Sequence, residues 1–293
     1  MAAPVKKEQN YFVRFAILII AAAVLFVMGT LAILYFGLGY RYVSYTYEKE
    51  DGQAVRTVRG LVRVDDNGEL LTGTVWSDDG VDFSVKQVES GYYEVTYSNG
   101  DVYEGNLYQL LRNGNGKLTF ANGDVYQGSF RENIPEGEGT YYYFNGDIYQ
   151  GGFRNGKKSG DGIYTWAPVE GETQRVYQGS FENDMRNGYG VYYYANGSKY
   201  SGEFVDDLKV DDDATLIIMN EDGTQDIYVG GFVEDIKSGY GEYRWESGAV
   251  YIGEFANDIM EGQGTYIWPG GVHSYTGTFK GNKPYIEDII VNE

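Results

Sequence analysis

One short pattern recurs along most of the chain and limits the folds that the chain can adopt. It reads Tyr-x-Gly-x-Phe, a polar gap, Gly-x-Gly-x-aromatic-x-aromatic, and then a turn into the next Tyr-x-Gly. The opening residues are Tyr103, Tyr126, Tyr149, Tyr177, Tyr200, Tyr228, Tyr251 and Tyr275. Their spacing of 23 to 28 residues indicates an array of small, similar units.

Each unit has the period of β-strands rather than helices. The special residues fall at every second position within each half of the pattern, so each half is a strand with one distinctive face. We expect a type I′ hairpin turn at the Asn-Gly pairs, because both central residues of that turn need positive φ. A polar linker of roughly six residues, such as Glu182 to Asn187, is then expected between hairpins. The Asn-Gly pairs are Asn99-Gly100, Asn122-Gly123, Asn145-Gly146 and Asn196-Gly197.

Hairpins of this kind are stable only when they stack, because one hairpin alone is marginal in water. Gly128 shares a face with Tyr126 and Phe130, so we expect neighbouring aromatic rings to lie across the bare glycine backbone. The 30 tyrosines suit a face that is apolar yet partly wet. The predicted fold is therefore all-β: an elongated, single-layer antiparallel sheet of stacked hairpins, preceded by one transmembrane α-helix.

The pattern resembles the MORN repeat (membrane occupation and recognition nexus) over about residues 91 to 284. The resemblance implies a twisted sheet of hairpins with an aromatic groove, and a role as a scaffold, a self-associating module, or a lipid or protein binder. One matching unit consists of Tyr149, Gly151, Phe153, Gly160, Gly162, Tyr164 and Trp166. Two more begin at Tyr228 and Tyr251 and end at Trp245 and Trp268.

The N-terminus has the composition of a membrane anchor. Residues 12–37 are almost wholly apolar and long enough to cross the ~30 Å hydrocarbon core. Lys6, Lys7 and Arg14 precede the span or lie at its start, which favours a cytoplasmic N-terminus and extracytoplasmic repeats. A cleaved signal peptide is the alternative, although no clear small-x-small cleavage site follows. We interpret the chain as a bacterial, single-pass protein of the cell membrane.

Composition limits the partners. The chain has no cysteine, and 20 basic and 42 acidic residues follow the span. A domain this acidic is expected to be repelled by nucleic acid and by bare anionic lipid. We divide the chain into a cytoplasmic tail (1–11), the anchor (12–37), a juxtamembrane β segment that caps the array (38–90) or forms a small separate module, the repeat array (91–284) and a C-terminal tail (285–293).

The fifth unit departs from the pattern. Asp211 and Asp213 stand where Gly-x-Gly is expected, and the run from Leu216 to Met219 replaces the aromatic strand. The acidic segment Asp206–Asp213 is either a calcium ligand set or, as its spacing favours, a solvated linker. The third unit carries an extended loop from Ala167 to Arg175, and such loops often carry recognition in repeat proteins.

No motif indicates catalysis or a cofactor, so we expect neither an enzyme nor a metal protein. The single histidine, His273, lies in a turn after Pro269 and is expected to be a surface residue. Two functions remain: a membrane-anchored scaffold whose aromatic groove holds a protein or a second copy, or an extracytoplasmic module that binds carbohydrate or cell wall.

The partner-binding residues are predicted in the second strand of each hairpin. There the inner aromatic is expected to be core, while the outer aromatic, nearer the turn, is expected to stay partly exposed and form the interface. These outer residues are Tyr143, Trp166, Tyr194, Trp245 and Trp268.

Overall fold

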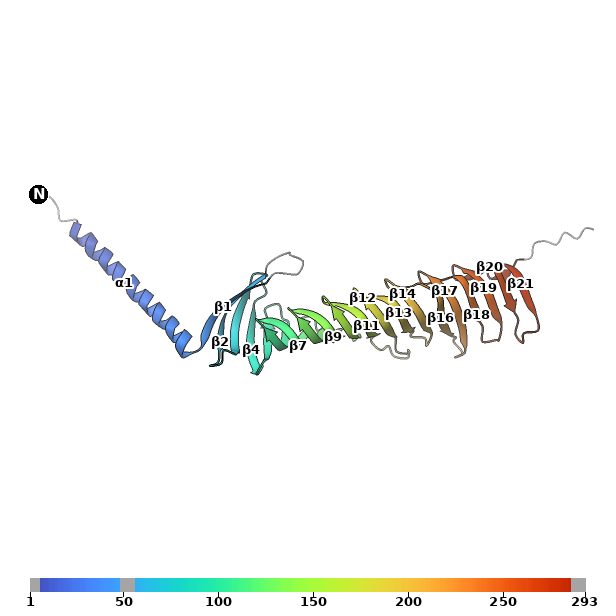
Figure 1. Ribbon diagram of the computed structural model, residues 1–293, viewed down its shortest axis with the longest axis horizontal. Coiled ribbons are helices and arrows are strands. Elements are labelled where there is room, and N and C mark those ends of the chain that lie inside the picture. Colours follow the sequence, from blue (N-terminus) through green and yellow to red (C-terminus); the bar gives the residue numbers. More distant parts are fainter. Residues whose placement is uncertain (1–5, 48–55, 286–293) are drawn as a thin grey trace, which may run out of the picture. The chain divides into compact units, whose positions relative to one another are not determined.

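The computed structural model describes residues 6–47 and 56–285, in which one N-terminal helical segment precedes 22 strands (Figure 1). The chain divides into two compact units, Met1–Leu111 and Arg112–Glu293. Every strand pairing that the structure gives is antiparallel, and the sheet is open, which confirms the predicted fold class. The predicted tails extend outside the described residues, at 1–5 and at 286–293.

The first unit begins with an apolar helix. The α-helix α1 (Lys6–Ala32) continues into one π-helical stretch, η1 (Ile33–Gly37). Its segment Ala16–Gly37 has a mean hydropathy of 2.9 with no buried residue, so by length and composition it is able to cross a membrane. The Arg41 guanidinium stacks 3.8 Å from the ring centroid of Tyr35, at the end of this segment.

The rest of the first unit is a meander with a valine core. Alternate residues such as Val58, Val75, Val85 and Val95 are buried, as expected for strands with one inward face. The predicted cap, 38–90, contributes the first four strands. The strands are β1 (Tyr40–Tyr47), β2 (Arg56–Val64), β3 (Leu70–Ser77), β4 (Phe83–Glu89), β5 (Tyr92–Tyr97) and β6 (Val102–Tyr108), and β7 (Leu111–Thr119) starts at the unit boundary.

The second unit is an array of hairpins in which consecutive strands lie side by side (Figure 1). Its strands are β8 (Val125–Arg131), β9 (Ile134–Tyr142), β10 (Ile148–Arg154), β11 (Lys157–Thr165), β12 (Val176–Glu182), β13 (Met185–Tyr193), β14 (Lys199–Val205) and β15 (Leu208–Lys209). They continue with β16 (Asp211–Met219), β17 (Gln225–Val233), β18 (Ile236–Arg244), β19 (Val250–Ala256), β20 (Ile259–Ile267), β21 (Ser274–Lys280) and β22 (Lys283–Pro284). Strand β14 pairs with both β15 and β16.

The Asn-Gly turns are not the predicted type I′ turns. In the turn after β9, the Tyr143 N–H donates to the Asp147 carbonyl at 2.9 Å, which closes a loop of three residues. Gly146 has a φ of 93°, whereas Asn145 does not have positive φ. This is the geometry of a type I turn followed by a left-handed glycine, so only the glycine needs conformational freedom.

Type I′ turns instead occupy the place of the predicted polar linkers. Asn183 and Asp184 both have positive φ, at 51° and 76°, and they join β12 to β13 directly. The prediction of a linker from Glu182 to Asn187 is therefore wrong. Asn and Asp tolerate the left-handed region almost as glycine does, so a pair of them serves as a two-residue turn.

The core of the array is a row of buried Tyr and Phe rings from the Tyr-x-Gly-x-Phe strands. The Tyr149 side chain is fully buried, and its hydroxyl donates to the Gly152 carbonyl at 2.9 Å. A Cβ on Gly162 of the facing strand would lie 2.5 Å from the Tyr149 ring, which confirms that the rings lie across bare glycine backbone. The Tyr149 ring also contacts Phe153 and Phe181 edge-to-face at 5.2 and 5.0 Å. Each tyrosine thus joins two hairpins.

Candidate partner-binding surface

A second row of aromatic rings lies beside this core, on the same side of the sheet. We name it the aromatic row. It shares the core face because Tyr164 stands directly opposite the buried Tyr149 in the register. Consecutive centroids are 4.5 to 5.9 Å apart. Its members are Phe120, Tyr141, Tyr143, Tyr164, Trp166, Tyr192 and Tyr194, and then Tyr243, Trp245, Tyr266 and Trp268.

The structure places all five predicted interface residues in the aromatic row. Tyr143, Trp166, Tyr194 and Trp245 are half-buried, and Trp268 is 41% exposed. These side chains therefore combine firm packing on one side with an accessible surface on the other, which is how aromatic residues at interface cores are arranged.

The inner rings of the aromatic row are not the fully buried core that the sequence suggested. Tyr164 and Tyr243, for example, are half-buried. The glycine that admits a buried tyrosine, such as Gly162, stands two residues before the inner ring. The core consequently lies under the Gly-x-Gly segment, and the inner rings form its border.

The aromatic row is interrupted at the fifth unit. Leu216 stands opposite Tyr228, and Ile218 follows two residues later, where other units have aromatic rings. The predicted alignment of the two aspartates with the Gly-x-Gly is corrected by the register: Ala214, not Asp213, faces Gly230, while Asp211 faces Phe232. One extra residue in the bulge of β16 causes this shift. The interruption separates the rings up to Tyr194 from those that begin at Tyr243.

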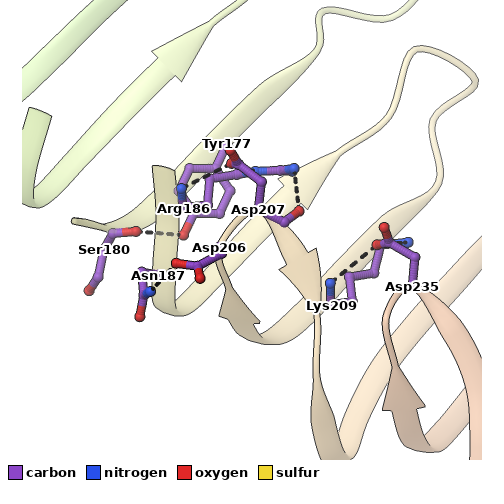
Figure 2. A network of polar contacts seen from close by, with 8 residues as sticks. All are labelled: Tyr177, Ser180, Arg186, Asn187, Asp206, Asp207, Lys209 and Asp235. Atoms are coloured by element: carbon purple, nitrogen blue, oxygen red, sulfur yellow. Dashed lines mark hydrogen bonds and ion pairs between the residues drawn. The ribbon is translucent and has the colours of Figure 1, made fainter. Parts of the chain in front are cut away.

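A regular set of cations connects neighbouring hairpins along the core face (Figure 2). Arg186 forms an ion pair with Asp207 of the following turn at 2.8 Å, and Lys209 forms one with Asp235 at 3.3 Å. The Arg186 N–H also donates to the Asp207 carboxylate, and the Asp207 N–H donates to the Arg186 carbonyl, both at 3.0 Å. The Arg186 guanidinium lies 4.8 Å from the Phe204 centroid.

These ion pairs were missed in the sequence, although a signal was present. A basic residue recurs as the second residue of β11, β13, β15 and β18, and an Asp recurs as the second turn residue one hairpin later. Three of these positions form ion pairs: Arg186 with Asp207, Lys209 with Asp235 and Lys237 with Asp258. At the fourth, the backbone N–H of Lys158 donates to the Asp184 carboxylate.

The acidic segment Asp206–Asp213 is occupied with protein contacts. One oxygen of Asp211 accepts the Glu203 N–H at 2.7 Å and the other accepts the Asp213 N–H at 2.8 Å. Asp207 belongs to the ion pair with Arg186. Within residues 6–47 and 56–285, no group of three or more His, Asp or Glu side chains is placed to hold a metal ion.

Buried and hydrogen-bonded groups along the aromatic row have shifted pKa values. A hydrogen bond from the Phe144 N–H holds the pKa of Asp124 below its usual range. Partial burial opposes this effect, and hydrogen bonds from Asn122 and Tyr141 add to it. Burial, together with the charges of Asp184 and other carboxylates, raises the pKa of Tyr143 to about 12. The hydroxyl of Tyr143 is therefore neutral at physiological pH.

The extended loop of the third unit covers part of the aromatic row. The guanidinium of Arg175, its last residue, lies 5.6 Å from the Trp166 ring centroid. Burial raises the pKa of Tyr192, and the nearby charge of Arg175 opposes that rise. The pKa of Asp147 is lowered against the effect of burial by hydrogen bonds from Tyr164, Ala167 and Asn145, with a smaller contribution from Arg175. The loop thus places a cation at the Trp166 ring, with its charge near Tyr192 and Asp147.

Comparison with known families identifies the repeats. Six segments match the family model of the MORN repeat: residues 103–125, 126–148, 149–168, 177–199, 228–250 and 251–272. The chain contains MORN repeats. The MORN match omits residues 200–227, where the extra bulge residue and the aliphatic side chains replace the glycines and rings of the pattern.

The other comparisons add little to the MORN assignment. No curated protein matches the chain. Among solved structures, the TCP10 domain of Danio rerio CPAP matches with 14% identity over 73% of this chain and 94% of that chain. Its TM-score of 0.28 is too low to support an argument about fold or function.

Proposed function

We propose that this protein is a membrane-anchored interaction scaffold whose MORN repeats bind a protein partner, or a second copy of the chain, through the aromatic row. The observation that carries the proposal is that two rows of aromatic side chains on one face of the sheet differ in their exposure. The Tyr-x-Gly-x-Phe rings are buried and hold the array together, whereas the rings of the aromatic row keep accessible surface.

Trp245 is the residue on which the proposal depends most. Its ring packs 4.5 Å from Tyr243 and 5.5 Å from Tyr266, and its side chain remains half-exposed. An aromatic side chain that is held rigidly and desolvated on binding is the usual anchor of a protein interface. Trp245→Ala is therefore expected to weaken partner binding by about 2 kcal/mol while the sheet stays folded.

The test is recovery of bound proteins on the immobilised full-length chain from solubilised membranes. Arg244→Ala is the matched control, because Arg244 points to the opposite face and pairs there with Glu242. Loss of the partner with Trp245→Ala but not with Arg244→Ala, at unchanged melting temperature, supports the proposal. Equal retention by both variants, or retention only on insoluble cell-wall material, contradicts it.

The apolar segment Ala16–Gly37 supports the anchoring role, and the basic residues Lys6, Lys7 and Arg14 before it favour a cytoplasmic N-terminus. In this topology, protease added outside intact cells, or spheroplasts where an outer membrane exists, removes the repeats. Full protection of the repeats until the membrane is disrupted would place them in the cytoplasm. An N-terminus that begins after residue 37 in the mature protein would make the segment a signal peptide instead.

A further inference from the structure

One site in the aromatic row is built like the site that Arg175 fills, but it has no arginine of its own. The filled site consists of Trp166, Tyr192 and Asp147, with the Arg175 guanidinium 5.6 Å from the Trp166 ring centroid and its charge near the other two groups. We name the second one the Trp245 site. It consists of Trp245, Tyr266 and Asp226.

The two sites have the same register. Trp166 and Trp245 each follow a tyrosine by two residues, and those tyrosines, Tyr164 and Tyr243, face Tyr149 and Tyr228. The rings are also spaced alike: Trp166 to Tyr192 is 5.2 Å at 60°, and Trp245 to Tyr266 is 5.5 Å at 52°.

The carboxylates of the two sites make equivalent hydrogen bonds. Asp147 accepts the Tyr164 hydroxyl and the Ala167 N–H, both at 2.7 Å. Asp226 accepts the Tyr243 hydroxyl at 2.9 Å and the Glu246 N–H at 2.8 Å. Each carboxylate is thus fixed beside its tryptophan and carries a negative charge towards the aromatic row.

The difference between the sites is one side chain. The Trp166 N–H donates to the Arg175 carbonyl at 3.2 Å, and the Trp245 N–H donates to the Ala249 carbonyl at 3.0 Å, so Arg175 and Ala249 hold the same backbone position. Ala249 is buried and has no charged group to place at the rings. No hydrogen-bond partner is found for the Tyr266 hydroxyl among the described residues, whereas the positive charge of Arg175 lies near Tyr192.

We propose that the Trp245 site binds an arginine side chain presented by the partner, in the way that Trp166, Tyr192 and Asp147 bind Arg175. A guanidinium stacks on tryptophan, donates to a hydroxyl and pairs with a carboxylate at the same time. The net charge of −20 adds long-range attraction for a basic segment. The proposal rests on the proposed function, since it names the chemistry of the partner at that surface.

The experiment uses the full-length chain in detergent micelles with 5-fluorotryptophan, because the four tryptophans give separate fluorine signals. Each signal is assigned by a Trp→Phe variant. The probe is N-acetyl-arginine amide, and the uncharged comparison is N-acetyl-citrulline amide. Arginine amide is expected to shift the Trp245 signal saturably and leave Trp166 unmoved, with citrulline amide binding about tenfold more weakly.

Two exchanged variants test the argument from equivalence. Arg175→Ala empties the first site, so the Trp166 signal should then shift with arginine amide as Trp245 does. Ala249→Arg supplies the missing side chain from within, so the Trp245 signal should move without probe and stop responding to it. Circular dichroism reports whether each variant is folded, and the wild-type comparison of the two amides needs no variant.

Several results would overturn the proposal. Equal shifts with arginine and citrulline amides would show that charge is not recognised, and equal shifts at Trp166 and Trp245 in the wild-type protein would show a general effect of an acidic surface. Absence of any Trp245 shift would also contradict it. In that case the scaffold function stands if Trp245→Ala still abolishes partner recovery, and it falls with the proposal if recovery is unchanged.

Discussion

The ion pair between Arg186 and Asp207 is the contact whose contribution to stability is most open to a direct test. The side chains are 23% and 48% exposed, so the pair is neither a surface pair, worth up to about 1 kcal/mol, nor a fully buried one. We expect a coupling energy of about 1 kcal/mol. The guanidinium also lies over Phe204, Tyr192 and Tyr177, which adds roughly 0.5 to 1 kcal/mol.

The chain itself supplies the neutral replacement. Met260 holds the position of Arg186 in a later hairpin, and its N–H donates to Asn282 at 2.7 Å, as the Arg186 N–H donates to Asp207. The substitutions are therefore Arg186→Met and Asp207→Asn, singly and together. Each single change is expected to cost about 1 to 2 kcal/mol, and the double variant about 1 kcal/mol less than their sum.

The assay is denaturant unfolding of the full-length chain, combined with native-state hydrogen exchange of residues 176–209, because repeat arrays open locally as well as globally. The coupling should fall in high salt, since both groups are partly exposed. A coupling of about 0.3 kcal/mol or less, or a double variant as damaged as the sum of the singles, would refute the account of the pair as a joint between hairpins.

Two further predictions test the core of the array. Gly162→Ala should destabilise the protein by roughly 1 to 3 kcal/mol in denaturant unfolding, because the new Cβ would lie 2.5 Å from the buried Tyr149 ring. Gly160→Asn in the same strand is the control, since φ there is +78° and the space around it is open. An equal cost for both substitutions would contradict this reason. Burial raises the pKa of Tyr177 and of Tyr251 to about 12, so the stability from these protonated hydroxyls is fully present below pH ~10 and should be lost as pH rises towards 12. The part of the phenolate absorbance that appears towards pH 12 should rise together with the loss of circular dichroism, and a titration in which every tyrosine forms phenolate near pH 10 with the fold intact would contradict the burial of these rings.

The period of the sequence was sufficient to predict the strands and the way in which they face each other. The contact between Tyr149 and Gly162 was predictable because a glycine inside a strand weakens it unless a bulky group, such as an aromatic ring, lies across its backbone. The turns were assigned the wrong way round, because Asn-Gly fits both a two-residue turn and the end of a three-residue loop, and only the number of paired residues decides between them.

The candidate surface was only partly predictable. The outer rings were found because the alternation of a strand places them on the core face near the turn, and Trp268 is exposed there as expected. The role of Arg175 was not predictable, because its contact with Trp166 depends on the path of an extended loop. The bulge that brings Ala214 opposite Gly230 likewise inserts one residue without any signature in the sequence.

The two-residue turns that accept hydrogen bonds from the preceding hairpin affect how the length of such a chain can change. At most joints an Asp or Asn of the turn accepts the same backbone N–H from the strand before it, as Asp207 does from Arg186 and Asn282 does from Met260. The exception is the joint at Pro135, which has no N–H and only accepts the Gly156 N–H. Loss or duplication of the 23 residues from Tyr177 to Lys199 would therefore bring together ends that already carry matching parts, because after the loss the Lys158 N–H, which donates to Asp184, would face Asp207. A gene for this array can therefore gain or lose whole hairpins by slippage and still encode an array in which neighbouring hairpins are bonded to each other. The fifth unit, with its aliphatic strand, is the one unit that differs from the others in such an array.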